Sequence, residues 1–161
     1  MPYGQLFDST SAADIPADAK EVAGYIDGAY VTWPQLRVRF PHAKKLSITV
    51  TGSLRAACAD VETGDLTPAQ GALWASRKAQ LRQRPRLYCN LSTWHEVIDA
   101  CSALHLPPHV VWWWIADWTG HAHAIAGASC VQYASPGYGS HGHYDVSQVF
   151  EARFVPDNRR T

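Results

Sequence analysis

A chain of 161 residues with 47% hydrophobic and 17% charged side chains is long enough for one domain with its own core, which excludes a disordered protein. Its 14 basic and 14 acidic residues balance, so we expect neither nucleic acid nor an anionic membrane surface as a partner. The longest apolar run, residues 110–116, is far shorter than the roughly 20 residues that cross a bilayer, and we expect no membrane insertion. The four scattered cysteines are expected to be buried, reduced thiols.

The amino-terminal half shows strand and helix signals in alternation. Residues 1–20 are polar with little periodicity and are interpreted as a lead-in. Residues 21–27 have the pattern of a first strand that ends on an acidic residue. A capping box with proline in the first turn predicts a short helix over residues 32–40. The β-branched residues 46–50 predict the next strand, and residues 58–62 predict a third.

The carboxyl-terminal half continues this alternation. Thr67 is expected to cap a helix to about residue 82, before a strand at 86–89. A second capping box starts a helix at Thr93, and Pro107-Pro108 ends it. The apolar run 110–116 is typical of a strand buried on both faces, and residues 129–133 predict another strand. A Gly-rich loop then leads to Tyr144-Asp145, and residues 151–161 are expected to be a polar, basic tail.

Six strands and three helices in this order predict an α/β fold. We expect a single domain over residues 21–150 that forms a reduced or irregular TIM-type (β/α) barrel, because typical eight-stranded barrels need roughly 200 residues or more. An open, doubly wound sheet is the second choice of architecture.

The tripeptide Asp60-Val61-Glu62 places two carboxylates at the end of a predicted strand. Residues two apart on a strand point to the same face, so both side chains are expected to project from the carboxyl end, where α/β folds build their active sites. Two neighbouring carboxyls do not ionise independently, and the one with the raised pKa can remain protonated near neutrality and donate a proton. This pair is therefore the predicted centre of a glycosidic-bond-cleaving site.

Further polar residues follow other predicted strands and are expected to converge on the same rim. They are Asp27, Asp117, Gln132 and Asp145. Aromatic residues beside them can stack on the faces of sugar rings, and these are Tyr30, Trp118, Tyr133 and Tyr144.

In these pieces the sequence resembles the lysozyme-type glycoside hydrolases of family 25 and their relatives in phages and actinobacteria. The resemblance covers roughly residues 23–150. It rests on six short segments: Gly24-Tyr25-Ile26-Asp27 for the first-strand aspartate, Asp60-Val61-Glu62, Tyr88-Cys89-Asn90 through Trp94, Trp114-Ile115-Ala116-Asp117-Trp118, Val131-Gln132-Tyr133, and Tyr144-Asp145. The chain departs from the family pattern in its shorter length and in Val131, where Trp is common.

The resemblance implies cleavage of the β-1,4 bond between N-acetylmuramic acid and N-acetylglucosamine in bacterial peptidoglycan. Glu62 would be the general acid, and Asp60 would stabilise an N-acetyl group of the substrate. Asp27, Asp117 and Asp145 would line the sugar subsite. Neither a metal nor another cofactor is implied. With no signal peptide recognised, we expect a phage or prophage endolysin that is made in the host cytoplasm and released to the wall by a separate lysis protein.

Two other functions remain open from the sequence. One is a non-catalytic cell-wall-binding or phage structural module on the same fold. The other is a zinc-dependent peptidoglycan amidase, because His121-Ala122-His123 and His141-Gly142-His143 form two H-x-H pairs in predicted loops.

Overall fold

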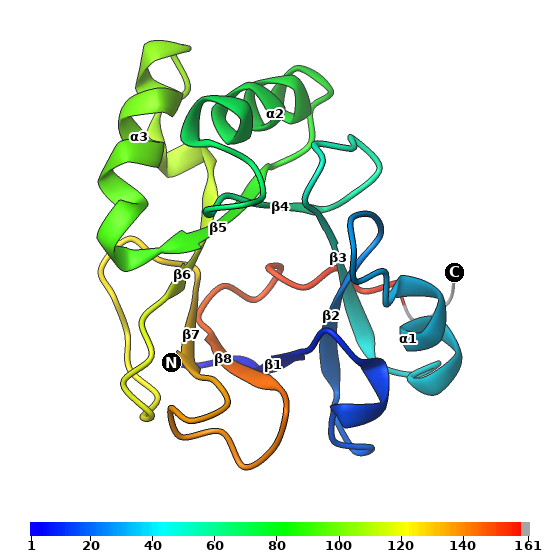
Figure 1. The fold of residues 1–161 in the computed structure, drawn as a ribbon. Helices are drawn as coiled ribbons and strands as arrows, with labels where there is room; N and C mark the ends of the chain where they lie inside the picture. Colours follow the sequence, from blue (N-terminus) through cyan, green and yellow to red (C-terminus); the bar gives the residue numbers. More distant parts are fainter. Residues whose placement is uncertain (159–161) are drawn as a thin grey trace.

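The computed structural model describes residues 1–158, which form a closed barrel of eight strands in sequential order (Figure 1). The strands are β1 (Gly4–Asp8), β2 (Glu21–Tyr25), β3 (Lys44–Thr49), β4 (Cys58–Asp60), β5 (Arg86–Asn90), β6 (Trp112–Ala116), β7 (Cys130–Ala134) and β8 (Asp145–Val149). Neighbours from β1 to β7 are parallel, whereas β8 pairs antiparallel with both β7 and β1. The expected TIM-type barrel is therefore confirmed.

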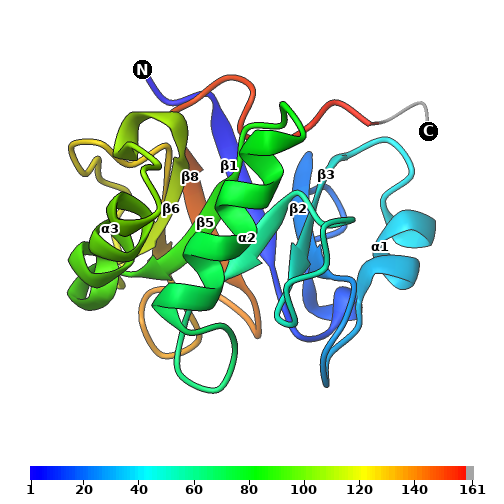
Figure 2. The ribbon, with the colours of Figure 1, turned by 90° about the horizontal axis from the view of Figure 1, so that it is seen from above.

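The barrel is reduced because only three of its connections within the described residues carry an α-helix. These helices are α1 (Trp33–Arg39) after β2, α2 (Pro68–Gln80) after β4 and α3 (Trp94–Ala103) after β5. Short 3-10 turns occur at Ala12–Asp14 (η1), Leu91–Thr93 (η2) and Pro108–Val110 (η3). Figures 1 and 2 show α2 and α3 side by side over β4 to β6, with α1 beside β2 and β3. None of the described helices is long and apolar enough to cross a membrane.

Local sequence explains where the helices begin. Thr67 and Gln70 form the full capping box of α2, in which each side chain bonds the backbone of the other residue. The two capping boxes that the sequence predicts, which begin at Thr32 and Thr93, do not form. Thr32 instead accepts a hydrogen bond from the Tyr25 amide, and Thr93 donates to the Asn90 carbonyl. Both side chains thus attach a helix start to the strand before it.

Residues 1–20 and 151–158 differ from the lead-in and tail expected for them. Strand β1 completes the barrel between β2 and β8, and its Leu6 is fully buried. After β8, Phe154 and Val155 are buried against the inside of the barrel. Figure 2 shows this segment at the end of the barrel opposite the β4–α2 and β7–β8 loops. Residues 159–161, the last of the expected tail, lie outside the described residues.

The core has separate inner and outer parts. Inside the barrel, Leu6, Leu46, Tyr88, Trp114 and Phe154 belong to one buried cluster. Outside it, α2 and α3 pack on the apolar outer faces of β4 to β6, and α1 with η1 covers β2. All four cysteines are buried and free. The inner cluster fills the barrel below the rim and so forms the floor on which a site can be built.

Candidate active site at the carboxyl end of the barrel

A cavity of about 240 Å³ opens at the end of the barrel where the parallel strands terminate. Four carboxyl groups line it, from Asp8, Asp60, Glu62 and Asp145. Asp8 and Asp60 are the last residues of β1 and β4. Asp145 is the first residue of β8, and because β8 runs antiparallel, its amino end reaches the same rim. This end of the barrel therefore gathers acidic groups from three strands and the β4–α2 loop.

The Asp60-Val61-Glu62 segment reaches the cavity as its spacing predicts. Asp60 is only 2% exposed, whereas Glu62 is exposed at the mouth. Val61 lies between them with its side chain buried on the opposite face, against Gly71 of α2, and its amide donates to the Tyr88 carbonyl at 2.9 Å. The backbone thus stays bonded to β5 for one residue beyond β4, which keeps both carboxyls on the cavity side.

Burial and mutual repulsion keep protons on these acids. Burial, with added repulsion from the carboxylates of Glu62, Asp65 and Asp8, raises the pKa of Asp60 to about 9. Partial burial and the carboxylates of Asp65 and Asp145 also raise the pKa of Glu62. Asp60 is therefore a neutral acid at pH 7, and Glu62 retains its proton to a higher pH than a solvated glutamate does.

A second acidic pair lies across from the first. Asp8 and Asp145 are direct partners in the β1–β8 ladder. Burial, followed by the charge of Asp145, raises the pKa of Asp8 well above its usual range, although a hydrogen bond from Gln132 opposes the shift. Burial also raises the pKa of Asp145. Because two adjacent carboxylates repel each other, this pair holds at least one proton more readily than two separate aspartates would.

Gln132 on β7 connects the acids to the aromatic wall of the cavity. Its Nε2 donates to Asp8 Oδ1 at 3.2 Å and to Asp145 Oδ2 at 3.4 Å. Its Oε1 accepts from the Tyr88 hydroxyl at 3.0 Å and from Trp118 Nε1 at 2.8 Å. All of these bonds fit a single orientation of the amide, which fixes the positions of the groups around it.

Aromatic rings form the floor and one side of the cavity. Trp114 is fully buried in the floor and meets the Tyr88 ring edge-on, with centroids 5.1 Å apart. Trp118 lines the cavity, is 40% exposed and packs against the exposed Tyr138 at 5.5 Å. An exposed indole beside carboxyl groups offers a flat apolar surface next to hydrogen-bonding partners, which suits the two faces of a sugar ring.

The structure brings together five of the ten residues that the sequence indicated for the site. They are Asp60, Glu62, Trp118, Gln132 and Asp145.

Two expected aspartates lie elsewhere. Asp27 is two residues beyond β2 and accepts hydrogen bonds from the Thr49 and Thr51 hydroxyls and the Val50 amide. Asp117 pairs with His123 at 2.9 Å in the β6–β7 loop. Neither lines the cavity, so the structure does not bring these two aspartates together with Asp60 and Glu62.

The three expected tyrosines are also outside the cavity. Tyr30 is exposed in the β2–α1 loop. Tyr133 points away from the barrel interior because it alternates with Gln132, and its hydroxyl accepts from Gln5. Tyr144 packs edge-on against Phe7, on the outer side of β1. For Tyr133 the placement follows from strand alternation, which puts neighbouring residues on opposite faces, whereas Tyr30 lies in a loop and Tyr144 directly precedes β8.

Sequence reasoning missed Asp8, Tyr25, Tyr88 and Trp114 as cavity residues. Asp8 carried a usable signal, since it follows the apolar pair Leu6-Phe7 and precedes a Ser-Thr-Ser turn, as an acid at a strand end does. It is Asp8, and not Asp27, that ends the first strand of the barrel.

One group of side chains among the described residues has metal-ligand geometry. Oxygen atoms of Asp60, Glu62 and Asp65 lie within 4.8 Å of one another. Acidic clusters of this kind are common without an ion, and here the same proximity adds to the effect of burial in raising the pKa values. No histidine of residues 1–158 belongs to such a group.

Comparison with known proteins shows a likeness in fold. No protein-family model matches the sequence, and no curated protein matches it. The modular Cpl-1 endolysin complexed with a peptidoglycan analogue superposes with a TM-score of 0.57 at 14% identity. A mutant of the same endolysin, in complex with a tetrasaccharide-pentapeptide, gives 0.55 at 13%. The multimodular pneumococcal cell wall endolysin from phage Cp-1, complexed with choline, gives 0.53 at 12%. Each match covers 93% of this chain and 55% of the other, so the chain spans about half the length of these endolysins.

Proposed function

We propose that this protein is a glycoside hydrolase that cleaves the β-1,4 bond between N-acetylmuramic acid and N-acetylglucosamine in bacterial peptidoglycan. The observation that carries the proposal is the pairing of a buried Asp60 with an exposed Glu62 in one cavity at the carboxyl end of the barrel. The fold likeness to an endolysin complexed with a peptidoglycan analogue supports this substrate class. An origin in a phage or prophage fits the same likeness, because one of the matching endolysins comes from a phage.

Glu62 is the proposed general acid. Its carboxyl is exposed at the cavity mouth and its pKa is raised, so it can reach a glycosidic oxygen and carry a proton to it. As the bond from C1 to that oxygen breaks, the proton of Glu62 passes to the departing sugar. The resulting carboxylate then accepts a proton from the water that adds to C1, which returns Glu62 to its starting state.

Asp60 is proposed to hold the N-acetyl group of the sugar that is cleaved at C1. It lies deeper in the cavity than Glu62, and its Oδ1 has no hydrogen-bond partner among the described residues. Contact with the amide would orient its oxygen to bond to C1 as the leaving oxygen departs, before water displaces it. Asp145 and Gln132 are then proposed to bind sugar hydroxyls, and Trp118 to stack on a ring face.

Digestion of purified cell walls tests this proposal. We expect wild-type protein to release new reducing ends, and Glu62→Gln to lower the rate by about 10²–10⁴-fold, the usual range for loss of a general acid. Asp60→Asn is expected to slow the reaction as well. Asp117→Asn, an acid at the same end of the barrel but outside the cavity, is the control and should remain active.

Three outcomes would contradict the proposal. New amino groups in place of reducing ends would indicate an amidase. Full activity of Glu62→Gln would remove Glu62 from the role of acid. Wall binding without release of either group would favour the non-catalytic module.

A further inference from the structure

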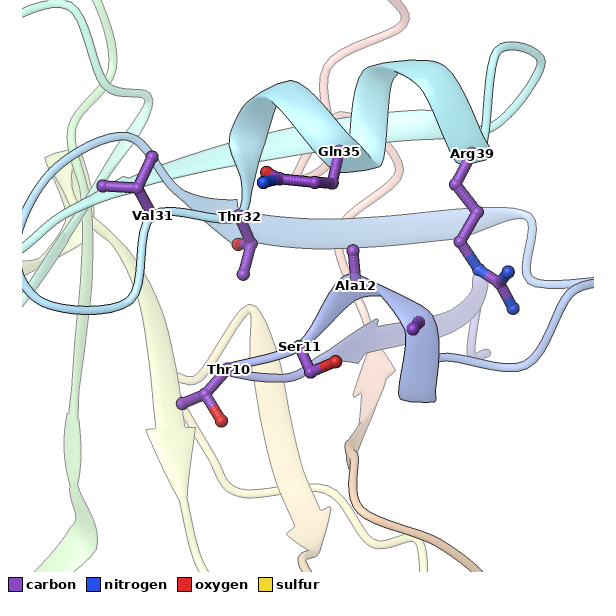
Figure 3. A pocket seen from close by; sticks show the side chains of 8 residues that line it. Thr10, Ser11, Ala12, Val31, Thr32, Gln35 and Arg39 are labelled. Carbon is purple, nitrogen blue, oxygen red and sulfur yellow. The ribbon is translucent and has the colours of Figure 1, made fainter.

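A second cavity adjoins the catalytic one, between the 3-10 turn η1 and helix α1 (Figure 3). It encloses about 560 Å³. Its polar lining consists of the side chains of Thr10, Ser11, Thr32, Gln35 and Arg39, and Ala12, Ala13 and Val31 complete it. We refer to these eight residues as the α1 groove. Hydroxyl, amide and guanidinium groups thus face a shared space outside the barrel.

The α1 groove continues from the catalytic cavity. Thr10 lines both spaces, because it lies just beyond Asp8 at the end of β1. Figure 3 shows Thr10 and Val31 near one end of the groove and Arg39 at the other. The two spaces thus adjoin at Thr10, and Arg39 lies at the end of the groove away from the catalytic cavity.

The two spaces differ in charge. Four carboxyl groups line the catalytic cavity, whereas Arg39 is the single charged residue among those that line the α1 groove. Its Nη2 donates to the Ile15 carbonyl at 3.1 Å, and its guanidinium lies 5.3 Å from the Phe40 ring centroid. No described carboxylate forms an ion pair with it. The side chain thus contacts Ile15 and Phe40, while its charge is not paired with any carboxylate of residues 1–158.

The length of the groove suits a short peptide. Thr32 and Arg39 are the N-cap and the last residue of α1, and seven residues of helix span about 10 Å. An extended peptide covers roughly 3.3–3.6 Å per residue, so about three residues fill this distance. The exposed Gln35 lies between the two ends and offers both a donor and an acceptor to a peptide backbone.

We propose that the α1 groove binds the peptide stem of peptidoglycan, with a carboxylate of the stem against Arg39. The inference rests on the proposed function, since the sugar that bears the stem would occupy the catalytic cavity. A neutral ring then lies among the acids, and the anionic stem passes Thr10 into the groove. The groove would make the protein prefer glycan that carries peptide over glycan from which peptide has been removed.

Calorimetric binding to the Glu62→Gln protein tests this, because turnover is suppressed while both spaces remain. The ligands are a glycan oligosaccharide of alternating N-acetylglucosamine and N-acetylmuramic acid with its peptide stems, and the same oligosaccharide after the stems have been removed. The latter retains its lactyl carboxylates, so it separates these from the carboxylates of the stem.

Four further substitutions are made in this background. Arg39→Gln removes the charge and Arg39→Lys keeps it. Ala13→Glu adds a negative charge to the groove without touching the Arg39–Ile15 bond. Arg37→Gln removes an exposed charge from the same helix outside the groove and is the matched control. Thermal unfolding of each variant checks that it is folded.

We expect the stem-bearing glycan to bind more tightly, with Arg39→Gln and Ala13→Glu each weakening it roughly fivefold, the scale of one exposed charged contact. Arg39→Lys should recover most of that loss, and Arg37→Gln should have no effect. Equal binding of both glycans, unchanged in Arg39→Gln and Ala13→Glu, would overturn the groove assignment and leave the proposed function standing. Failure to bind either glycan would overturn both.

Discussion

At the scale of single residues, Asp60 and Asp27 show that the surroundings of an aspartate can shift its pKa in either direction. Burial and neighbouring carboxylates raise the pKa of Asp60 to about 9. Partial burial alone would raise the pKa of Asp27, but hydrogen bonds from Thr49, Val50 and Thr51 outweigh it and lower the value. Asp27 is thus stabilised as an anion that holds the β2–α1 and β3–β4 loops together, whereas Asp60 is stabilised as a neutral acid.

This contrast predicts opposite pH dependences of stability for two Asp→Asn variants. In the folded protein Asp60 binds its proton up to about pH 9, whereas in the unfolded chain it loses it near the usual 3.8. The folded state therefore binds more protons between these values, and the contribution of Asp60 to stability falls as pH rises from about 4 to 9. Asp60→Asn removes this loss. As pH rises from about 4 to 9, the free energy of unfolding of Asp60→Asn relative to wild type should therefore increase by up to about 1.4 kcal/mol for each pH unit.

Urea unfolding at pH 3, 5, 7 and 9 measures this trend, with Asp27→Asn as the control of opposite sign, whose change is expected below pH 4. The pKa of Asp27 is lowered, so its contribution is present above about pH 4 and is lost as pH falls through the folded-state pKa. Asp27→Asn should be less stable than wild type at pH 7, and the difference should vanish in acid. A pH-independent difference between Asp60→Asn and wild type would contradict the raised pKa of Asp60.

Gln132 gives a second prediction at this scale. Gln132→Leu leaves the buried Tyr88 hydroxyl and Trp118 Nε1 without their acceptor and removes a donor from Asp8. We expect the free energy of unfolding to fall by about 1–3 kcal/mol, because a buried polar group has lost its partner. Denaturant unfolding measures this change. The control is Gln83→Leu at an exposed position, a substitution that should change the free energy of unfolding by less than about 0.5 kcal/mol. Equal effects would show that Gln132 contributes no net hydrogen bonding.

At the scale of elements, helix α2 positions the carboxyl pair through one close contact. A Cβ added to Gly71 would overlap the Cγ2 methyl of Val61, which lies between Asp60 and Glu62. In an open helix, Gly→Ala stabilises by about 1 kcal/mol, but here overpacking is expected to exceed that gain. Gly71→Ala should therefore lower the free energy of unfolding by about 1–3 kcal/mol and also reduce wall digestion.

The double variant Gly71→Ala/Val61→Ala separates contact from helix propensity. Val61→Ala removes the methyl that the new Cβ would meet, so the effect of Gly71→Ala measured on that background should be small or stabilising. Denaturant unfolding of all four proteins gives the coupling energy between the two sites. Additive effects would mean that α2 does not press on the carboxyl pair.

Most elements were predictable because their signals are local. The β-branched β3, the apolar β6 and the Thr67 capping box each depend on residues next to one another in the chain. β1 and β8 were not predicted because each has few apolar residues, and their pairing joins the two ends of the chain. Ser147, for example, is buried inside the barrel as the acceptor of Trp114 Nε1, an environment that its neighbours in sequence do not reveal.

The sequence indicated residues that line the cavity where spacing along one strand sufficed, and it missed others where the order of the strands had to be known. Asp60 and Glu62 reached the cavity through their spacing alone. Asp27 took the role of first-strand aspartate only because β1 was unrecognised, and Asp8 was lost for the same reason. Gln132 and Tyr133 were both expected at the site because both lie near the end of a strand. Side chains alternate along a strand, however, so these two neighbours point to opposite faces.

At the scale of the whole molecule, the barrel interior is continuous from the catalytic cavity to the carboxyl-terminal segment. Trp114 lines the cavity and meets the Phe154 ring edge-on, with centroids 6.1 Å apart. Arg86 holds that segment by donating to the carbonyls of Phe154 and Arg153. The residues after β8 thus close the barrel from below and support the floor of the site.

This continuity predicts that replacing two buried phenylalanines, Phe154 and Phe40, has different effects on the site. Phe154 lies inside the barrel below Trp114, whereas Phe40 lies outside it, beneath α1. Replacing either by Ala should lower the free energy of unfolding by about 3–5 kcal/mol, from lost burial and the cavity left behind. Only Phe154→Ala leaves space beneath Trp114, so only this variant should also weaken binding of the glycan without peptide stems, which does not use Arg39, at a temperature where both proteins are folded. Calorimetry of both variants in the Glu62→Gln background measures this, and equal weakening would show that the site responds to overall stability and not to its floor.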